Sequence, residues 1–282
     1  PVRAFFGELS ARPRRTKSYP FVLLDKKIDL DQLLAMNHAM RYPVSYVQGP
    51  PGAGKTQTIV NILLTAFFNE RTVLFTSYNN HPINGVYEKL QSLTYRNRKI
   101  PFPVARLGNE DEVKKTLAHI RELYDSVKDV TVYSGTLDKN HKQQSEQAKR
   151  LTDYLETYEQ IVELQERKEA VESLLKPGLQ MNFQLELETS QIPRIEEELK
   201  KKGTVSIEGA LSLIETDPEE MRKYLYYTSV KYIQRLSEPK NADLVRILRM
   251  SDENERWMEF NKYISQDNNL DKFLRIFPIV CT

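Results

Sequence analysis

The stretch GPPGAGKT, residues 49 to 56, constrains the fold of this chain more than any other feature. It satisfies the pattern G-x-x-x-x-G-K-[ST], whose small residues let backbone N–H groups close around phosphates. A β-prone run, VSYVQ, precedes it, and the helical apolar stripe of TQTIVNILLTAFF follows it. A strand before the loop and a helix after it are the context that phosphate binding requires, because the helix adds its positive N-terminal end. The sequence therefore predicts a P-loop domain that binds a nucleotide.

The residue types in and around this loop predict ATP and Mg²⁺ as cofactors. Lys55 would reach the β and γ phosphates, and the Thr56 hydroxyl would help to hold Mg²⁺, which makes these two the predicted catalytic residues. Gln32 lies upstream on an expected helix, and its amide offers both a donor and an acceptor to the adenine edge. The predicted nucleotide-binding residues are Gln32, Gly49, Pro50, Pro51, Gly52, Ala53, Gly54, Lys55, Thr56 and Gln57.

Residues 28 to 109 alternate between helix and strand patterns. RTVLFTS is a continuous apolar strand of the kind that is covered on both faces, and FPVARLG is the next expected strand. LDQLLAMNHAM and INGVYEKLQSL carry apolar residues at helical spacing. This alternation predicts an α/β fold, a RecA-like P-loop NTPase core with a parallel sheet and helices on both faces.

Polar residues follow the strand within VLFTSYNN. The carboxyl ends of parallel strands form the edge at which open α/β sheets bind ligands. Thr76, Ser77, Asn79 and Asn80 are therefore predicted to donate hydrogen bonds to a single strand of nucleic acid, although such residues also cap helices and form turns.

The character of the chain changes over residues 110 to 275, which we interpret as a helical insertion. EQAKRLTDYLETYEQIVELQERKEAVESLL is rich in charged residues and leucine and contains neither glycine nor proline. Pro177 and Gly178 interrupt it, and IPRIEEELKKKG resumes the helix and ends at Gly203. Two charged helices around a Pro-Gly turn predict a coiled-coil hairpin at about residues 140–203, which leaves open a protein partner for this insertion.

The ends of the chain differ from its middle. Residues 1 to 27 form an irregular basic segment in which Arg12, Arg14, Arg15 and Lys17 are candidate phosphate contacts. Residues 276 to 282, within FPIVCT, are expected to return to the core as a strand, and the chain is expected to be a segment of a longer protein.

Composition excludes some classes of protein. There are 41 basic and 39 acidic residues, so any basic surface for nucleic acid must be local. The single cysteine, Cys281, excludes an internal disulfide framework and favours a reducing, cytoplasmic compartment. No apolar run is long enough to span a bilayer, so we expect no membrane partner.

Gln32, QGPPGAGKT and VLFTSYNNHPINGVYEKL, in this order and spacing, resemble superfamily 1 helicases of the branch that includes the nonsense-mediated-decay helicase. In that family a segment of the form APSNxAxDxL follows the strand, and Asn79 and Asn80 fall on its Ser and Asn. The position of the family's Asp is Asn84 here, and FPIVCT is similar to the strand that carries its next threonine-containing segment. The resemblance implies the first RecA-like domain of an ATP-driven translocase on single-stranded DNA or RNA.

The chain departs from the family in one respect. It contains no apolar run that ends in Asp-Glu, the acidic strand end that would hold Mg²⁺ through water and polarise the attacking water. The segment is therefore expected to bind ATP and to hydrolyse it poorly or not at all. Two other functions stay open: a coiled-coil-bearing P-loop ATPase of DNA repair or chromosome maintenance, and a nucleotide-switched protein-interaction module.

Overall fold

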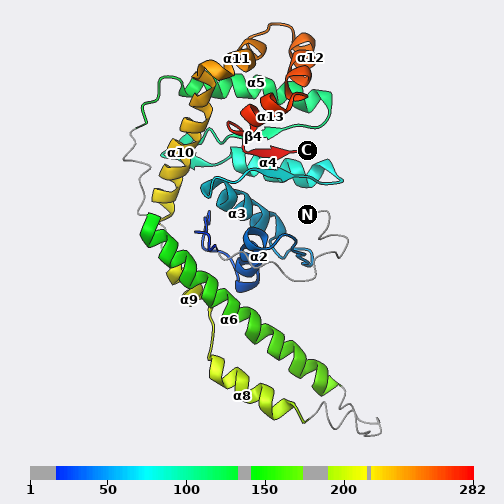
Figure 1. Ribbon diagram of the computed structural model, residues 1–282, viewed down its shortest axis with the longest axis vertical. Helices are drawn as coiled ribbons and strands as arrows, with labels where there is room; N and C mark the ends of the chain where they lie inside the picture. Colours follow the sequence, from blue (N-terminus) through cyan, green and yellow to red (C-terminus); the bar gives the residue numbers. More distant parts are fainter. Residues whose placement is uncertain (1–16, 133–140, 174–189, 215–216) are drawn as a thin grey trace. The chain divides into compact units, whose positions relative to one another are not determined.

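A computed structural model of the chain describes residues 17–132, 141–173, 190–214 and 217–282 (Figure 1). These residues form two compact units, each assembled from separate stretches of the chain. The core unit comprises Phe21–Asp25, Gln48–His141 and Thr216–Thr282, and the arm unit comprises Pro1–Pro20, Lys26–Val47 and Lys142–Glu215. The candidate phosphate contacts Arg12, Arg14 and Arg15 lie outside the described residues.

Three short parallel strands form the sheet of the core unit. They are β1 (Val73–Phe75), β4 (Val104–Arg106) and β5 (Ile279–Cys281), in the order β1–β5–β4. Val280 at the middle of β5 is aligned with Leu74 on one side and with Ala105 on the other. The residues of β5 and β4 are all buried, as in strands covered on both faces. β1, for which the sequence predicted such cover, differs, because Leu74 at its middle is 64% exposed. The parallel sheet that the sequence predicts is therefore confirmed, and the last strand of the chain is its central strand.

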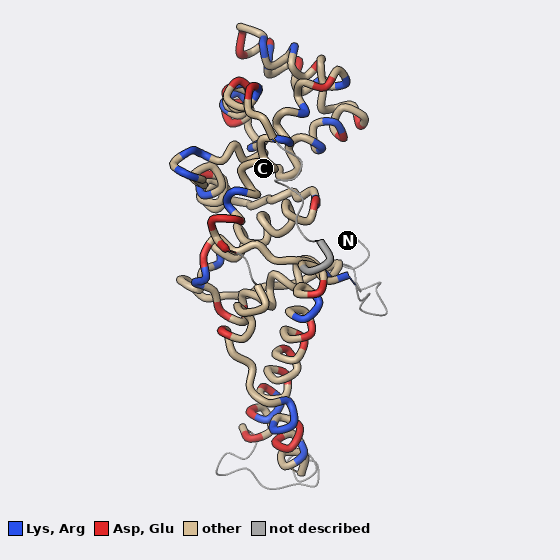
Figure 2. Tube along the Cα trace, turned by 90° about the vertical axis from the view of Figure 1, so that its left-hand side faces the viewer, with Lys and Arg blue, Asp and Glu red and all other residues tan. Residues whose placement is uncertain are grey.

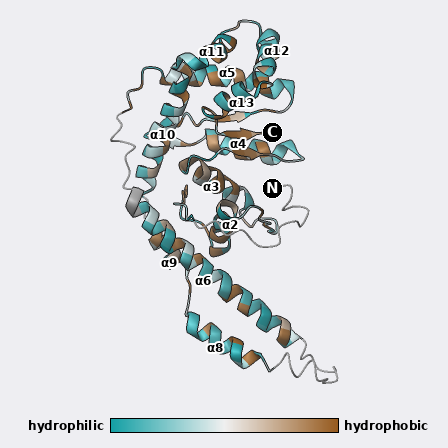
Figure 3. Cartoon of the chain, in the orientation of Figure 1, coloured by the Kyte–Doolittle hydropathy of each residue, from teal (hydrophilic) through white to brown (hydrophobic). Residues whose placement is uncertain are grey.

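Helices lie on both sides of this sheet (Figure 1). α4 (Asn80–Gln91) and α5 (Glu110–Val127) contact β4 from opposite sides, and α3 (Lys55–Phe68) packs against α4. α3 is among the most apolar helices of the molecule (Figure 3). Eight of its side chains are buried. Near its end the ring of Phe67 meets Phe102 at a centroid distance of 4.8 Å, in the edge-to-face geometry that aromatic pairs prefer.

The C-terminal helices complete the same core. They are α10 (Pro218–Gln234), α11 (Ala242–Leu248), α12 (Glu253–Ile264) and α13 (Asp267–Leu274), with two 3₁₀ turns, Arg235–Ser237 and Pro239–Asn241, between α10 and α11. Tyr232 of α10 lies 5.2 Å from Phe67, between ring centroids, and buried residues of α11 to α13 join the sheet in one cluster. The structure therefore divides residues 110–275 between its two units, whereas the sequence pattern suggested one insertion.

A two-stranded hairpin, which the sequence analysis did not anticipate, precedes β4. It pairs β2 (Thr94–Tyr95) with β3 (Arg98–Lys99). The two residues between the strands, Arg96 and Asn97, have positive φ angles of 48° and 61°. Two consecutive positive φ angles are typical of the type I′ turn, whose twist suits a tight hairpin. Arginine is rare at such a position, which is why the turn is difficult to recognise from sequence.

Residues 44–48, VSYVQ, are not a strand in the structure, contrary to the prediction. Val44, Tyr46 and Val47 are 53%, 85% and 51% exposed. β-branched and aromatic residues favour strands mainly because they pack against neighbouring strands. Among the described residues, this segment has no strand beside it, so its propensity does not produce a strand.

The arm unit is built from α2 (Leu30–Arg41), α6 (His141–Ser173), α8 (Ile192–Lys202) and α9 (Ile207–Leu213). α2 and α6 are joined by three polar contacts. Tyr158 donates to Asp31 over 2.8 Å, His38 lies 3.2 Å from Glu159, and Arg41 lies 2.7 Å from Glu156. Burial, together with the hydrogen bond to Asp31, raises the pKa of the Tyr158 hydroxyl to about 12. These contacts place α2 with the helical arm rather than with the predicted core.

α8 runs beside α6 (Figure 1). The Nζ atom of Lys168 lies 2.7 Å from Glu196, and Lys202 donates to Gln160. Basic and acidic residues alternate along this part of the arm (Figure 2), and Ile195 is the buried residue of α8. α8 ends at Gly203 with a φ of 74°, as predicted. The coiled-coil character of the pair stays a prediction, because the Pro177–Gly178 turn lies outside the described residues.

Within the described part of the chain, none of the helices is both long enough and apolar enough to cross a membrane.

Candidate nucleotide-binding site and sheet edge

The glycine-rich segment 49–54, called the phosphate loop below, leads directly into α3. Gly52 and Gly54 have φ angles of 85° and 71°, in the left-handed region that glycine adopts without strain. Gly54 is the N-cap of α3; no side chain caps this end, and the first turn of α3 carries no acidic residue. The N–H groups of that turn therefore point out of an uncapped, positively polarised helix end. This is the arrangement that binds phosphate in proteins.

Gly49, at the start of the loop, lies close to Ala53 and Lys55. A Cβ atom at this position would lie 3.4 Å from the Cβ of Ala53 and 3.6 Å from the Cγ of Lys55. The backbone N–H of Ala53 donates to the carbonyl of Pro50 over 3.2 Å and closes the loop. A Cβ atom at Gly49 would thus make ordinary van der Waals contacts, and the bond between Ala53 and Pro50 is what closes the loop.

Lys55 is turned back onto the loop that precedes it. Its Nζ atom donates to the carbonyl of Gly49 over 2.8 Å and to that of Pro50 over 2.7 Å. The side chain is otherwise exposed. The two carbonyl groups hold the ammonium group at the mouth of the loop, where phosphate oxygens would be stronger acceptors because they are charged. The donor set of the loop thus fits a phosphate group.

Thr56 and Gln57 lie in the first turn of α3. Thr56 is exposed, as a metal ligand must be. The described residues contain no group of three or more His, Cys, Asp or Glu that could hold a metal ion, so a Thr56 hydroxyl on Mg²⁺ would need phosphate oxygens and water as further ligands. The Gln57 amide accepts a hydrogen bond from Lys89 and lies 3.4 Å from the Asn61 oxygen. Its contact with nucleotide stays a prediction.

Gln32 has a structural task that the sequence analysis did not foresee. Its Oε1 atom accepts a hydrogen bond from the backbone N–H of Asp29 over 3.2 Å, while Asp29 Oδ1 accepts from the backbone N–H of Gln32 over 2.7 Å. This reciprocal pair is a capping box that begins α2. Gln32 belongs to the arm unit and the phosphate loop to the core unit. Recognition of adenine by Gln32 stays a prediction.

The predicted nucleic-acid residues follow β1 at the carboxyl edge of the sheet. Thr76, Asn79 and Asn80 are exposed, and Ser77 is half-buried and accepts a hydrogen bond from the backbone N–H of Asn79 over 3.3 Å. Asn79 is the N-cap of α4, but its side chain makes no capping hydrogen bond, and the first turn of α4 has no acidic residue. This edge therefore presents hydrogen-bond donors and a positive helix end, which suits phosphate oxygens.

The structure does not bring the phosphate loop and this edge together. Gln57, in the first turn of α3, is bonded to Lys89 in the last turn of α4, whereas Asn80 begins α4. A helix of this length spans roughly 18 Å at about 1.5 Å per residue. The two predicted groups are thus linked to opposite ends of one helix.

The side chain of Arg106, which ends β4, was missed by the sequence analysis. The side chain is buried, and its Nε atom donates to Glu112 over 2.9 Å. Its Nη2 atom donates to the side-chain oxygen of Asn80 over 3.3 Å. The available signal was an arginine at the last position of an otherwise apolar strand. Because Arg106 is the last residue of β4, its charged group lies at the carboxyl edge of the sheet.

Two pKa values report the electrostatics of this edge. Burial alone would raise the pKa of the Glu112 carboxyl, but hydrogen bonds from Lys115 and Arg106 outweigh it, so this pKa lies below its usual value. Burial raises the pKa of the Cys281 thiol to about 11, against an opposing effect of Arg106. Glu112 is thus a carboxylate paired with Arg106, and Cys281 is a neutral core residue.

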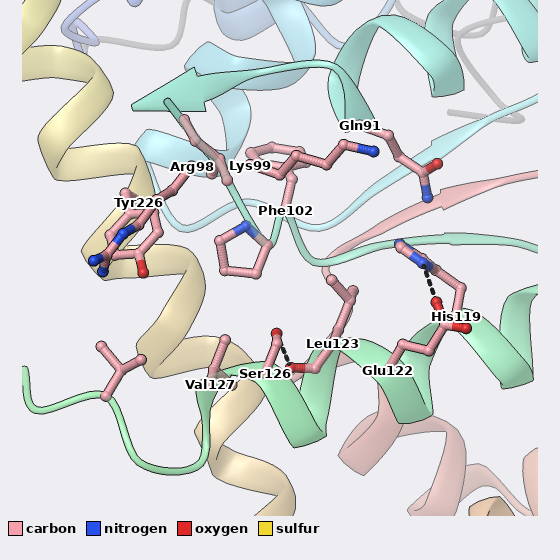
Figure 4. A pocket seen from close by; sticks show the side chains of 13 residues that line it. Gln91, Arg98, Lys99, Phe102, His119, Glu122, Leu123, Ser126, Val127 and Tyr226 are labelled. Atoms are coloured by element: carbon pink, nitrogen blue, oxygen red, sulfur yellow. Dashed lines mark hydrogen bonds and ion pairs between the residues drawn. The ribbon is translucent and has the colours of Figure 1, made fainter. Parts of the chain in front are cut away.

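A cavity of about 670 Å³ opens on another part of the core unit, below the β2–β3 hairpin and beside α5 and α10 (Figure 4). Apolar side chains such as Phe102 and Leu123 line it, with Lys99 and His119 among its polar residues. Burial lowers the pKa of His119, although Glu122, 3.9 Å away, acts to raise it. None of the predicted nucleotide or nucleic-acid residues lines this cavity.

Comparison with known families agrees with this geometry. Residues 27–275 match the model of a family described as an AAA domain. Because the match covers most of the chain, the chain belongs to this family. No solved structure matches it.

Three relatives illustrate the similarity. The chain is 38% identical over 68 residues to an uncharacterized ATP-dependent helicase of Mycoplasma pneumoniae, which covers 24% of this chain and 6% of that protein. It is 31% identical over 87 residues to mouse RNA helicase aquarius, a stretch that covers 30% of this chain and 6% of that protein. It is 28% identical over 112 residues to DNA-binding protein SMUBP-2 of Mesocricetus auratus, a stretch that covers 39% of this chain and 11% of that protein. The aligned stretches are thus a small part of each relative. The resemblance to superfamily 1 helicases is confirmed.

Proposed function

We propose that this chain is the ATP-binding part of an ATP-dependent nucleic-acid helicase or translocase. The observation that carries the proposal is the phosphate loop, in which two glycines with positive φ, an uncapped helix end and the Lys55 ammonium group come together at the start of α3. Membership of the AAA domain family and the helicase names of two relatives support it. The single strand would lie along the carboxyl edge at Thr76, Ser77, Asn79 and Asn80.

When bound, ATP with Mg²⁺ would supply the phosphate group whose transfer to water drives movement. The residues of this chain would bind and orient it. Backbone N–H groups of the loop and the Lys55 ammonium would hold phosphate oxygens, and the Thr56 hydroxyl would occupy one position on the metal. The bonds from Lys55 to Gly49 and Pro50 would be exchanged for bonds to phosphate.

Replacing Lys55 by alanine tests nucleotide binding. The change removes a charged donor to phosphate, so we expect the affinity for a fluorescent ATP analogue to fall by roughly tenfold or more. The measurement is a fluorescence titration in the presence of Mg²⁺. Lys262→Ala is a matched control, because Lys262 is an exposed lysine of α12 that is paired with Glu259.

Equal affinities for Lys55→Ala and the wild type would contradict the nucleotide site. Binding of a partner protein that survives Lys55→Ala, together with no affinity for nucleic acid, would favour an interaction module instead.

ATP hydrolysis by the chain itself is a separate prediction. The sequence contains no apolar run that ends in Asp-Glu, so an acidic group that polarises the attacking water is missing from these residues. We expect phosphate release by the purified chain to equal that of the Lys55→Ala variant, with or without single-stranded nucleic acid. Turnover that Lys55→Ala abolishes would show that another residue of this chain performs this step.

A further inference from the structure

Arg106 lies where the sheet meets the predicted nucleic-acid edge. Its guanidinium group extends from the end of β4 and donates to side chains in the first turns of two different helices, Asn80 of α4 and Glu112 of α5. The side chain is 5% exposed. A charge this well buried is tolerated when it is paired and hydrogen-bonded, so the position of the guanidinium group is closely determined.

The partners of Arg106 hold it in place. Its Nε atom lies 2.9 Å from Oε2 of Glu112, and Lys115 lies 3.3 Å from the other oxygen of the same carboxylate. The Glu112 backbone N–H is in turn bonded to the Asn109 side chain over 3.0 Å, in the cap of α5. Within the described residues the Nη1 atom of Arg106 is buried without a hydrogen-bond partner. Buried donors left in this way are uncommon.

This pairing decides how the Asn80 amide is oriented. A guanidinium group only donates, whereas an amide has one oxygen that accepts and an NH₂ group that donates. The oxygen of Asn80 must therefore face Arg106, as its 3.3 Å distance to Nη2 shows. The NH₂ group is then directed away from Arg106, on a residue that is exposed.

We propose that Arg106 is a positioning residue that turns the NH₂ group of Asn80 toward the phosphodiester backbone of a bound single strand. The proposal rests on the proposed function, since it requires a strand at this edge. The donor from Asn80 adds to the uncapped end of α4, where neither a side-chain cap nor an acidic residue competes with phosphate. Arg106 contributes through Asn80 and is itself too deeply buried to reach the strand.

The substitution Asn80→Asp separates this role from a structural one. Aspartate has the same shape and two acceptor oxygens, so it keeps the contact with Arg106 and strengthens it by charge. Its second oxygen replaces the NH₂ donor and repels phosphate. We expect a thermal unfolding temperature no lower than that of the wild type, together with roughly tenfold or greater loss of affinity for single strands.

The experiment measures fluorescence anisotropy of labelled oligothymidylate and oligouridylate with the wild type, Asn80→Asp, Asn80→Ala, Arg106→Gln and the double variant Asn80→Ala/Arg106→Gln. If Arg106 acts through Asn80, then Arg106→Gln lowers the affinity in the wild-type background and has no further effect in the Asn80→Ala background. Because Arg106→Gln removes a buried ion pair, its unfolding temperature is recorded alongside.

The outcomes are distinct. If Asn80→Asp left the affinity for oligonucleotides unchanged, this inference would be overturned and the proposed function would stand. The same conclusion would follow if Arg106→Gln lowered the affinity equally in the wild-type and Asn80→Ala backgrounds. No binding of either oligonucleotide by the wild type would overturn the nucleic-acid part of the proposed function, and this inference with it.

Discussion

At the scale of single residues, the chemistry of this protein depends on which groups are kept charged. Glu112 is held as a carboxylate by Lys115 and Arg106, and Lys55 rests on carbonyl oxygens that it can leave. His119 is the opposite case, because burial favours its neutral form. The same physical principle, the balance between burial and a charged partner, thus gives opposite results at Glu112 and His119.

The lowered pKa of His119 predicts a pH dependence of stability. Burial lowers this pKa, Glu122 acts to raise it, and Lys99 acts to lower it further. The unfolded chain therefore binds a proton that the folded chain does not, so the contribution of His119 is fully present above its ordinary pKa of about 6.5 and is lost as the pH falls below it. We expect the free energy of unfolding to fall more for the wild type than for His119→Gln between about pH 7.5 and about pH 5.

Urea titrations at the two pH values measure this difference. The same loss of unfolding free energy in both proteins would mean that other groups account for the pH dependence of the core unit.

At the scale of elements, local signals decide where helices begin and end. Asp29, Asn109 and Asp252 each accept a backbone hydrogen bond at the start of a helix, and Gly203 ends α8. α3 and α4 lack such caps, so the backbone N–H groups of their first turns stay available to a predicted phosphate ligand at α3 and to a predicted nucleic-acid strand at α4. α8, α11 and α13 also begin without a side-chain cap, so a missing cap does not by itself mark a binding site.

The pairing of α8 with α6 predicts a cost for truncating its buried residue. Ile195 is 3% exposed in a helix whose other residues are mostly exposed and charged. Ile195→Ala removes apolar burial and leaves a gap, which typically costs about 2–4 kcal/mol. We expect faster amide hydrogen exchange in α8, with exchange in the core unit unchanged.

Lys200→Ala is the control, since Lys200 is an exposed residue of the same helix and alanine is compatible with a helix. If Lys200→Ala and Ile195→Ala changed exchange in α8 equally, the packing of Ile195 would not be what holds α8.

At the scale of the whole molecule, the chain passes between its two units several times. The core unit is assembled from three separate stretches of the chain, and strand β5 of its sheet comes from the last of them. Contacts of this kind are distant in sequence, which makes the core a cooperative assembly rather than a sum of local pieces.

Truncation of Phe102 tests this cooperativity. Phe102 is 2% exposed and packs against Phe67, so Phe102→Ala should lower the free energy of unfolding of the core unit by about 3–5 kcal/mol. Leu74→Ala is an apolar control, because Leu74 is 64% exposed and should change stability by about 0.5 kcal/mol or less. Denaturant titration followed by the exposure of Cys281 to a thiol reagent reports on the core, because this thiol is buried in β5.

Similar effects of the two truncations on the labelling of Cys281 would show that Phe102 is not part of the cooperative core.

The sequence by itself determined the family resemblance and the apolar strands of the sheet, and it predicted the phosphate loop, because these depend on residues close together in the chain: short apolar runs, glycines and Lys55. It could not determine that residues 44–48 would lack a strand, since a strand exists only beside its neighbours. Nor could it place Asn80 on Arg106, or divide residues 110–275 between two units. Those features arise from contacts between distant residues, and burial and charge pairing select them only once the chain is folded.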